Sequence, residues 1–257
     1  MKDLSVQILT APQGKTHLFF LGQAGFVVKS AAGELLAVDL YLSDCVERLE
    51  GHMGFKRLQP ALLNPEDVCF DWVITTHPHW DHFDVDAVPG FMANRKTRLY
   101  ASIECRPLSV MLRLDAQRIQ YVRVGDQARC GDFDIQFVFC DHGDGAPDAF
   151  GLVITVDGKK IYMAGDTCLR LDKAAQIAEL GPFDIMIAPI NGAFGNLSER
   201  ECAVLSAHLK PALTIPCHYG ICAAHGGEPG KFMTHMAQEA PGQKYLLMAN
   251  GEQLIIE

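Results

Sequence analysis

Three histidines and an aspartate crowd into six consecutive residues. The run reads Thr75-Thr76-His77-Pro78-His79-Trp80-Asp81-His82. Neutral imidazole is the commonest metal ligand in proteins and suits divalent zinc, manganese, iron and nickel. In an extended turn, His77 and His79 point the same way and can bind one ion, while Asp81 and His82 can bind a second ion nearby. The spacing therefore predicts a metal centre rather than a histidine-rich surface loop or a set of buried, hydrogen-bonded histidines.

Three further predicted strands each end in a ligand-type residue close to a glycine. The segments are Cys140-Asp141-His142-Gly143, Gly165-Asp166-Thr167 and Pro216-Cys217-His218-Tyr219-Gly220. Polar side chains at such strand ends commonly face the rim of a cavity. Taken alone, each fits a cap or a buried hydrogen-bonding role equally well. Together with the first cluster, His142, Asp166 and His218 complete a set of seven ligands, which is what two ions sharing one carboxylate need.

Strands come first along the chain, and helices then alternate with strands. The predicted strands are His17–Leu21, Phe26–Lys29, Leu35–Asp39, Trp72–Thr76, Ile135–Phe139, Leu152–Val156, Lys160–Ala164, Phe183–Pro189, Leu213–Pro216, Tyr245–Met248 and Gln253–Ile256. The predicted helices are Glu104–Leu114, Leu171–Leu180 and one that opens at the capping box of Ser198 and Glu201 and ends before Pro211. This order favours two sheets sandwiched between helices over a doubly wound parallel sheet. Since no linker or repeat interrupts the pattern, residues 1–257 are predicted to form one domain.

Composition narrows the class of protein. The 257 residues are 49% hydrophobic and 21% charged, which is typical of a globular chain. Twenty-two basic against 31 acidic residues give a net charge of −9, which disfavours binding to nucleic acid or to an anionic membrane. Nine cysteines without a C-x-x-C pair predict reduced thiols and a cytoplasmic location. No apolar run approaches 18 residues, so no membrane span is expected. A homo-oligomer is compatible with all of these features.

The motifs together resemble the metallo-β-lactamase superfamily. The shared features are H-x-H-x-D-H after a strand, a later strand-end histidine, Gly-Asp-Thr and Pro-x-His-Tyr-Gly. Four other segments resemble the branch that contains L-ascorbate-6-phosphate lactonase and related metal-dependent hydrolases. These segments are 21–26, 38–44, 189–192 and 250–252. Leu40 and Ala193 depart from the branch pattern, which has Pro at the first position and often a basic residue at the second.

The resemblance implies a fold, a ligand set and a chemistry. The fold is an α/β (α+β) four-layer αββα sandwich of two mixed β-sheets flanked by helices. One ion would be held by His77, His79 and His142, and the other by Asp81, His82 and His218, with Asp166 bridging the two. Two dications minus two carboxylates leave a charge of about +2, which would ionise a shared water near neutral pH. Zinc or manganese is the expected metal, with iron or nickel as alternatives.

Other residues are candidates for supporting roles. Asp81 and Asp166 are the expected catalytic carboxylates. Asp39, at a strand end, is a candidate to accept a hydrogen bond from a ligand histidine, although it also fits a surface turn. The candidate substrate contacts, each of which also fits a purely structural role, are Asn191, Tyr219, Arg170 and His225. Of these, Tyr219 is a candidate oxyanion donor and Arg170 a candidate partner for an anionic group.

The predicted function is hydrolysis of a small, anionic lactone or ester, such as a sugar-phosphate lactone, by a metal-bound hydroxide. The alternatives are a small-molecule phosphodiesterase, a nuclease, a redox centre at iron, and a non-catalytic metal-binding homologue. A catalytic site keeps a coordination position open for water, whereas a structural site is closed. Because the seven ligands are intact, the sequence favours the hydrolase.

Overall fold

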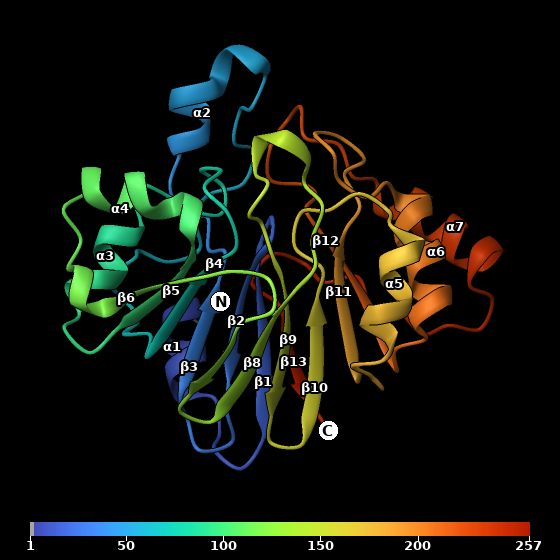
Figure 1. The fold of residues 1–257 in the computed structure, drawn as a ribbon, viewed down its shortest axis with the longest axis horizontal. Helices are drawn as coiled ribbons and strands as arrows, with labels where there is room; N and C mark the ends of the chain where they lie inside the picture. The colour runs from blue at the N-terminus through green and yellow to red at the C-terminus, as the bar shows by residue number, and fades with distance from the viewer. Residues whose placement is uncertain (1–2) are drawn as a thin grey trace.

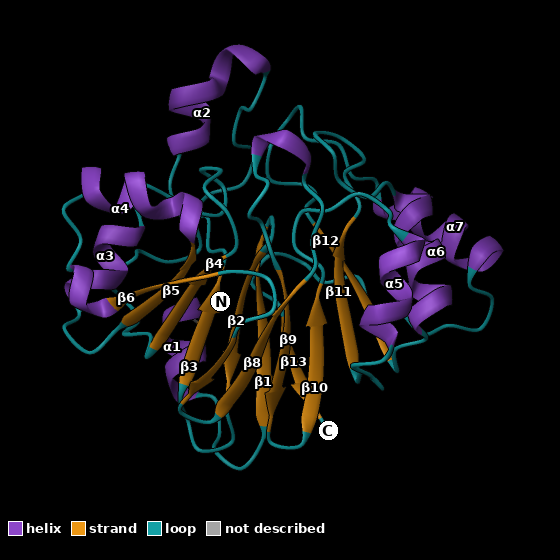
Figure 2. Ribbon diagram, in the orientation of Figure 1, coloured by secondary structure: helices purple, strands orange, loops and turns teal. Residues whose placement is uncertain are grey.

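Two mixed β-sheets lie face to face, and helices cover their outer faces (Figures 1 and 2). The structure is a computed structural model that describes residues 3–257. The seven-stranded sheet comprises β13 (Gln253–Ile256), β1 (Thr16–Gly22), β2 (Gly25–Lys29), β3 (Leu35–Val38), β4 (Trp72–Thr75), β5 (Arg98–Ser102) and β6 (Ile119–Val122), in that order. The six-stranded sheet comprises β12 (Leu213–Cys217), β11 (Ile185–Pro189), β10 (Lys159–Met163), β9 (Gly151–Val156), β8 (Phe133–Val138) and β7 (Gln127–Cys130). The predicted αββα architecture is confirmed.

Each sheet has an antiparallel half and a parallel half. In the first sheet, β13, β1, β2 and β3 pair antiparallel, while β3, β4, β5 and β6 pair parallel. In the second sheet, β7 to β10 pair antiparallel, while β10, β11 and β12 pair parallel. The parallel strand β11 is a continuous apolar run, and β12 is apolar except for Thr214, because helices and the opposite sheet cover both of their faces.

Three apolar layers hold the sandwich together. The central layer lies between the sheets and contains two ring pairs, Phe20 with Phe26 and Phe137 with Phe150, whose centroids are 4.8 and 5.0 Å apart. One outer layer packs the first sheet against α1 (Leu4–Thr10), α3 (Val88–Ala93) and α4 (Arg106–Met111). The other packs the second sheet against α5 (Leu171–Ala178), α6 (Glu199–Leu209) and α7 (Pro229–Glu239). Figure 2 shows these two helical layers on opposite sides of the molecule.

Local sequence signals account for several boundaries. Asp157 and Gly158 both have positive φ, as a type I′ turn requires, and they join β9 to β10 as predicted. Helix α6 begins at the predicted capping box, in which Ser198 accepts from the Glu201 backbone and the Glu201 carboxylate accepts from the Ser198 N–H. The helix ends at Leu209, and its C-cap residue Lys210 directly precedes Pro211.

Two predicted elements differ in the structure. The helix expected at Glu104–Leu114 is a 3-10 turn followed by the six-residue α4, because Arg113 adopts a left-handed conformation (φ 53°) soon after it. Tyr245–Met248 is not a strand, since only Tyr245 forms a bridge, to Thr214. The backbone there closes a loop instead of extending the second sheet.

Strand direction determines where the candidate residues meet. Because β8 and β10 each pair antiparallel with β9, and β12 runs parallel with β10 through β11, the carboxyl ends of β8, β10 and β12 lie at one edge. The loop after β4 reaches this edge from the other sheet. Above it stands α2 (Cys45–Glu50), at the top of Figure 1. The two sheets therefore bring distant segments together at one end of the sandwich.

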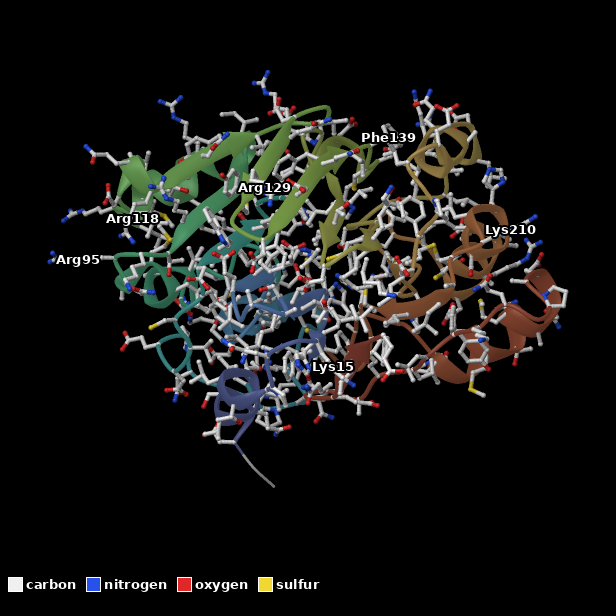
Figure 3. The ribbon with its side chains drawn as sticks, turned by 90° about the horizontal axis from the view of Figure 1, so that it is seen from below. Lys15, Arg95, Arg118, Arg129, Phe139 and Lys210 are labelled. Atoms are coloured by element: carbon white, nitrogen blue, oxygen red, sulfur yellow. The ribbon has the colours of Figure 1, made fainter. Side chains whose placement is uncertain are left out.

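Two further predictions concern the rest of the molecule. All nine cysteines lie in the described part of the chain, and each is a free thiol. No helix within residues 3–257 is both long and apolar enough to cross a bilayer. Figure 3, seen from below, shows Arg95, Lys15 and Lys210 well apart from one another.

Candidate metal centre

A buried carboxylate supports the loop that carries the histidine run. Asp39 follows β3, the parallel neighbour of β4, and its Oδ1 and Oδ2 accept hydrogen bonds from the Thr76 N–H (2.8 Å) and hydroxyl (2.6 Å). Its Oδ2 also lies 2.9 Å from Nδ1 of His82. Asp39 thus contacts a histidine of the cluster, as expected, and it leaves Nε2 of His82 facing the interior of the site.

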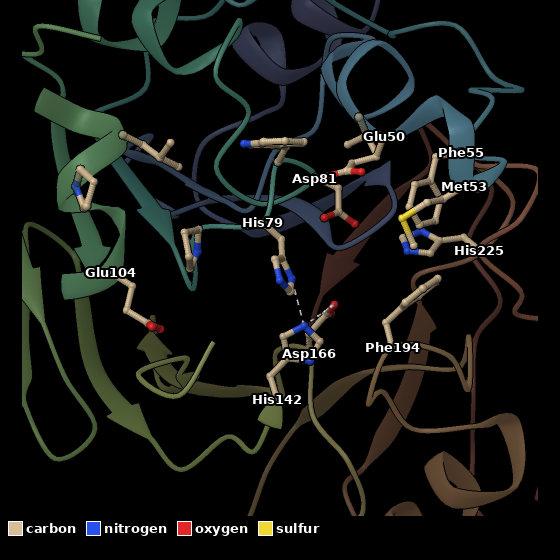
Figure 4. A pocket seen from close by; sticks show the side chains of 15 residues that line it. Glu50, Met53, Phe55, His79, Asp81, Glu104, His142, Asp166, Phe194 and His225 are labelled. Carbon is tan, nitrogen blue, oxygen red and sulfur yellow. Dashed lines mark hydrogen bonds and ion pairs between the residues drawn. The ribbon is translucent and has the colours of Figure 1, made fainter. Parts of the chain in front are cut away.

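Three ring nitrogens converge from the two sheets. Nδ1 of His79 lies 2.9 Å from Nε2 of His77 and 3.1 Å from Nε2 of His142. His77 and His79 come from the loop after β4, whereas His142 follows β8. Figure 4 shows His79 and His142 pointing toward each other. The three predicted ligands of one ion therefore share a single point in space.

A second group meets beside the first. Nε2 of His218, which follows β12, lies 3.4 Å from Oδ2 of Asp81. Nε2 of His82 lies 3.8 Å from the same oxygen. Each of these residues is buried. The three predicted ligands of the other ion are thus also brought together.

Asp166 lies between the two groups. Its Oδ2 is 3.1 Å from Nε2 of His218, 3.3 Å from Nε2 of His82 and 3.9 Å from Nε2 of His142. The residue is positioned by Gly165, whose φ of 69° turns the chain after β10 where a Cβ would meet the Phe150 carbonyl at 2.9 Å. One carboxylate thus faces both groups of ligands, which is the geometry expected of a bridge.

The first group consists of neutral imidazoles. Burial lowers the pKa of His77 well below its ordinary value, and the charge of His82 lowers it further. Burial also lowers the pKa of His79, and it lowers that of His142 to about 4. Neutral imidazole is the form that binds a metal ion, so these three side chains need to lose no proton to bind one.

The second group consists of ion pairs. Burial opposes a charge on His82, but the carboxylates of Asp166 and Asp39 raise its pKa well above the ordinary value. The pKa of His218 is raised to about 9, because Asp166 outweighs the effect of burial. In return, the histidine charges hold the pKa of Asp81 and that of Asp166 well below their usual range, although burial alone would raise them. The aspartates are therefore carboxylates at neutral pH.

The residues present fit a pair of divalent ions. Three overlapping groups of His and Asp ligand atoms each lie within 4.8 Å of one another. Nε2 of His82 is buried without a hydrogen bond of good geometry, and the polar atoms it faces are the carboxylate oxygens of Asp166 and Asp81. Mixed imidazole and carboxylate donors suit zinc and other first-row divalent metals.

Comparison with known proteins places this site in a family. A family model described as a beta-lactamase superfamily domain matches residues 39–219, which include all seven predicted ligands. The chain belongs to the metallo-β-lactamase superfamily. Its membership accounts for the two-sheet sandwich and for the position of the histidine run at the end of β4.

Relatives and structural neighbours agree with this assignment. A UPF0173 metal-dependent hydrolase of Thermococcus kodakarensis is 27% identical over 240 residues, covering 91% of this chain and 97% of the relative. The structure of Igni18, a metallo hydrolase from Ignicoccus hospitalis, matches with a TM-score of 0.71 at 21% identity, over 95% of this chain and 99% of that one. An isothiocyanate hydrolase from Delia radicum gut bacteria matches with a TM-score of 0.70 at 20% identity, over 93% and 98%. The two structures show the shared superfamily fold.

Gln23 contacts the site but was not among the sequence candidates. It lies in the turn between β1 and β2, where its φ is 55°, and it is fully buried. Its Nε2 donates to Oδ2 of Asp81 (2.8 Å) and to Nδ1 of His225. The Gly-Gln-Ala-Gly segment was visible in the sequence as a superfamily branch motif, but nothing local to it indicated which residue Gln23 would contact.

Asn196 is a second contact that the sequence did not indicate. Its Nδ2 donates to Oδ2 of Asp166 (2.8 Å) and to Oδ1 of Asn191 (3.1 Å). Oδ1 of Asn191, a predicted substrate contact, accepts from Asn196, which in turn donates to the carboxylate. Both residues lie in the loop between β11 and α6. The only signal in the sequence that this loop approaches the site was the position of Asn191 after a strand end.

A pocket of about 480 Å³ opens onto the cluster. His79, Asp81, His142 and Asp166 lie at its floor, and the candidate His225 lies on its wall (Figure 4). Burial and the neighbouring His218 lower the pKa of His225 to about 4, so the ring is neutral at pH 7. The placement of His225 is therefore compatible with its predicted contact to substrate.

Arg170 and Tyr219, two further predicted substrate contacts, are absent from the described lining of this pocket. The Arg170 guanidinium donates to Asp141 (2.6 Å) and Asp172 (2.9 Å), and it borders a separate small cavity. The Tyr219 hydroxyl donates a hydrogen bond to the carbonyl of Met248 (2.7 Å). Arg170 is paired with acidic side chains and the Tyr219 ring packs beside Phe20, so neither side chain lines the pocket above the cluster.

Proposed function

We propose that this protein is a metal-dependent hydrolase that opens a small ester or lactone. The observation that carries the proposal is the convergence of His77, His79, Asp81, His82, His142, Asp166 and His218 on two adjoining points at the floor of a pocket. The names of the relatives, metal-dependent hydrolase and metallo hydrolase, support the same class of reaction. A site used only for structure would need no open pocket above its ligands.

The ligands divide into two sets that share a carboxylate. His77, His79 and His142 would hold one ion, Asp81, His82 and His218 the other, and Asp166 would contact both. When bound, two divalent ions at these positions would acidify a water molecule and polarise the carbonyl oxygen of the substrate. We expect zinc or manganese, because histidine and carboxylate ligands suit both.

Gln23 fixes the position of a proton in the pocket. Because Asp81 is a carboxylate, it only accepts hydrogen bonds, so the amide –NH₂ of Gln23 must face it. The same –NH₂ donates to Nδ1 of His225, which therefore accepts. A neutral ring whose Nδ1 accepts carries its proton on Nε2. His225 would thus present an N–H donor to an oxygen of the bound substrate.

Hydrolysis then requires one bond to form and one to break. The water oxygen bonds to the carbonyl carbon, the bond from that carbon to the ester oxygen breaks, and a proton passes to the departing oxygen. Asp81 and Asp166, held as carboxylates, would orient the attacking water by accepting hydrogen bonds from it. The Nε2–H of His225 stabilises negative charge on the substrate as it develops.

Metal analysis combined with a substrate panel tests this proposal. Purified protein should hold close to two transition-metal ions per chain. A panel of 4-nitrophenyl esters, aliphatic lactones and bis(4-nitrophenyl) phosphate would be assayed before and after treatment with a chelator, and again after Zn²⁺ or Mn²⁺ is restored. Chelator-sensitive turnover of an ester or a lactone supports the proposal. Turnover of the phosphodiester alone would favour a phosphodiesterase, and failure to bind either metal would overturn the proposal.

A further inference from the structure

The walls of the substrate pocket carry no positive side chain. Its described lining contains neither lysine nor arginine. The apolar lining residues are Val46, Met53, Phe55, Pro78, Trp80, Pro107, Leu108 and Phe194. A site that recognises a phosphate or carboxylate ordinarily uses arginine, lysine or a helix N-terminus to do so. The lining therefore gives no support to the expectation of an anionic substrate.

Three basic side chains close to the pocket in sequence, those of Lys56, Arg57 and Arg170, make other interactions. Nζ of Lys56 pairs with Glu47 at 2.7 Å. The Arg57 guanidinium donates to main-chain carbonyls, including that of Ser43 at 2.9 Å. Arg170 is held by two aspartates, as described above. Recruiting any of them to a substrate anion would break an existing interaction.

Two glutamates make the walls negative. Glu50, at the end of α2, and Glu104, just before α4, both line the pocket and lie on opposite sides of it in Figure 4. One oxygen of Glu104 accepts from the Asp148 N–H (2.9 Å), which fixes the side chain in place. The positive charge of two bound ions would be confined to the floor, where it acts on the reacting carbonyl. A negative group farther along the substrate would meet carboxylates instead.

Phe194 adds an apolar wall to the pocket although its ring is partly exposed and its backbone is strained. Its side chain is 49% exposed, and its backbone has a φ of 55°, which is uncommon for a bulky residue. The ring lies 5.4 Å from Phe55 and 5.6 Å from His225, measured between centroids. Figure 4 shows Phe55, Met53 and His225 on the same side of the pocket. A strained, exposed aromatic residue next to a reaction site points to contact with a ligand.

We infer that the substrate is an uncharged ester or lactone with an apolar acyl arm, which packs against Phe194, Phe55 and Met53 while its carbonyl reaches the floor of the pocket. The inference rests on the proposed function and deepens it. Each methylene that becomes fully buried contributes roughly a factor of four to binding. An acyl chain of several carbons should therefore raise kcat/KM well above that of an acetyl group.

A series of matched esters tests the inference on the metal-loaded protein. The probes are 4-nitrophenyl acetate, 4-nitrophenyl hexanoate and the 4-nitrophenyl half-ester of adipic acid, which has the same six-carbon acyl chain ending in a carboxylate. We expect kcat/KM for the hexanoate to exceed that for the acetate by at least tenfold, and that for the half-ester by at least tenfold. Replacing both wall glutamates in one variant, E50Q with E104Q, should raise kcat/KM for the half-ester severalfold relative to kcat/KM for the hexanoate.

The Phe194→Ala variant tests the aromatic wall, with Met233→Ala as its control. Met233 lies on α7, outside the pocket, and is 44% exposed, close to the exposure of Phe194. The hexanoate-to-acetate ratio should fall about tenfold in Phe194→Ala and change less than twofold in Met233→Ala. Metal content, measured on each protein, separates a lost contact from a damaged centre.

The outcomes distinguish the two proposals. If the acetate is hydrolysed but the half-ester is preferred, or if Phe194→Ala leaves the ratio unchanged, the inferred substrate class is wrong while the hydrolase stands. If no ester and no lactone is turned over by the metal-loaded protein, the proposed function itself fails.

Discussion

The side-chain amide of Gln23 bridges Asp81 and His225, and its distance to Oδ2 of Asp81 is 2.8 Å. This contact joins a predicted metal ligand to a pocket residue 144 positions later in the chain. The Gln23 backbone takes part as well, since its carbonyl accepts from the His218 N–H at 2.7 Å. The turn between β1 and β2 therefore holds the orientation of two candidate ligands and of the proposed hydrogen-bond donor.

Replacing Gln23 by methionine should lower kcat by about 10- to 100-fold and leave bound metal close to that of the parent protein. Methionine has a similar length and the same Cβ, so the left-handed backbone is no more strained than before, but both donated hydrogen bonds are lost. The imidazole of His225 is then free to rotate and to change its tautomer. Steady-state kinetics and metal analysis measure the two quantities.

Gln117→Met is the matched control, because Gln117 is exposed on the 3-10 turn before β6. Its kcat and its bound metal should equal those of the parent protein. If Gln23→Met loses its metal along with its activity, Gln23 holds the ligand set together and its role in placing the His225 proton is not supported.

Replacing Asp166 by asparagine should reduce bound metal from two ions per chain to at most one. Oδ2 of Asp166 lies within 4 Å of ring nitrogens from both ligand sets, and a neutral amide cannot offset the charge of two dications. Asp144→Asn is the control, since Asp144 is exposed and only two residues from His142. Elemental analysis after dialysis measures the difference, and two retained ions in Asp166→Asn would exclude a bridging role.

The convergence of the candidate ligands was predictable because each of them follows a local pattern. A ligand-type side chain next to the end of an apolar strand is recognisable in the sequence, and parallel topology brings such ends to one edge. His142, Asp166 and His218 were found in this way, and Asp39 as well. The pattern predicts these residues because the strand that buries the apolar side chains also determines where the polar side chain at its end is placed.

The other contacts depend on tertiary packing that no local pattern encodes. Gln23 meets Asp81 only because the turn between β1 and β2 and the loop after β4, 58 residues apart in the chain, are brought together at one end of the sandwich. Arg170 stands four residues after Asp166, yet Asp141 from a different loop captures its guanidinium. The absence of lysine and arginine from the described lining of the pocket, and the position of Phe194, likewise depend on how the pocket is assembled. The chemical class of the substrate was therefore the prediction that the sequence supported least.

The stability of the metal-free protein should fall as the pH rises from 6.5 to 9. The pKa of His218 is raised from 6.5 to about 9 in the folded state, and that of His82 is raised as well. Their charged forms therefore stabilise the fold fully below about pH 6.5, and this stability is lost as the pH rises through about 9. Urea unfolding at several pH values should show a decrease on the order of 1–3 kcal/mol.

Metal-loaded protein provides the comparison for this pH dependence. Bound ions take the place of the protons on the ligand histidines, so the decrease should be smaller than in metal-free protein. Buried thiols with raised pKa values, such as that of Cys130 at about 11, affect both forms equally and cancel in the difference. Equal slopes in the two forms would show that His82 and His218 are not the charged partners of Asp166.

Replacing Ser198 by alanine should lower the free energy of unfolding by about 1 kcal/mol without loss of metal. The substitution removes the side-chain half of the capping box at α6, in which the Ser198 hydroxyl lies 2.8 Å from the Glu201 carboxylate. The loop that presents Asn196 to Asp166 stays closed by a backbone bond from Gly192 to Leu197 (2.9 Å). Ser198→Thr keeps the capping oxygen and should restore most of the stability. Chemical unfolding with parallel metal analysis tests both variants, and a coupled loss of metal in Ser198→Ala would mean that the cap, rather than the loop backbone, holds Asn196 against the carboxylate.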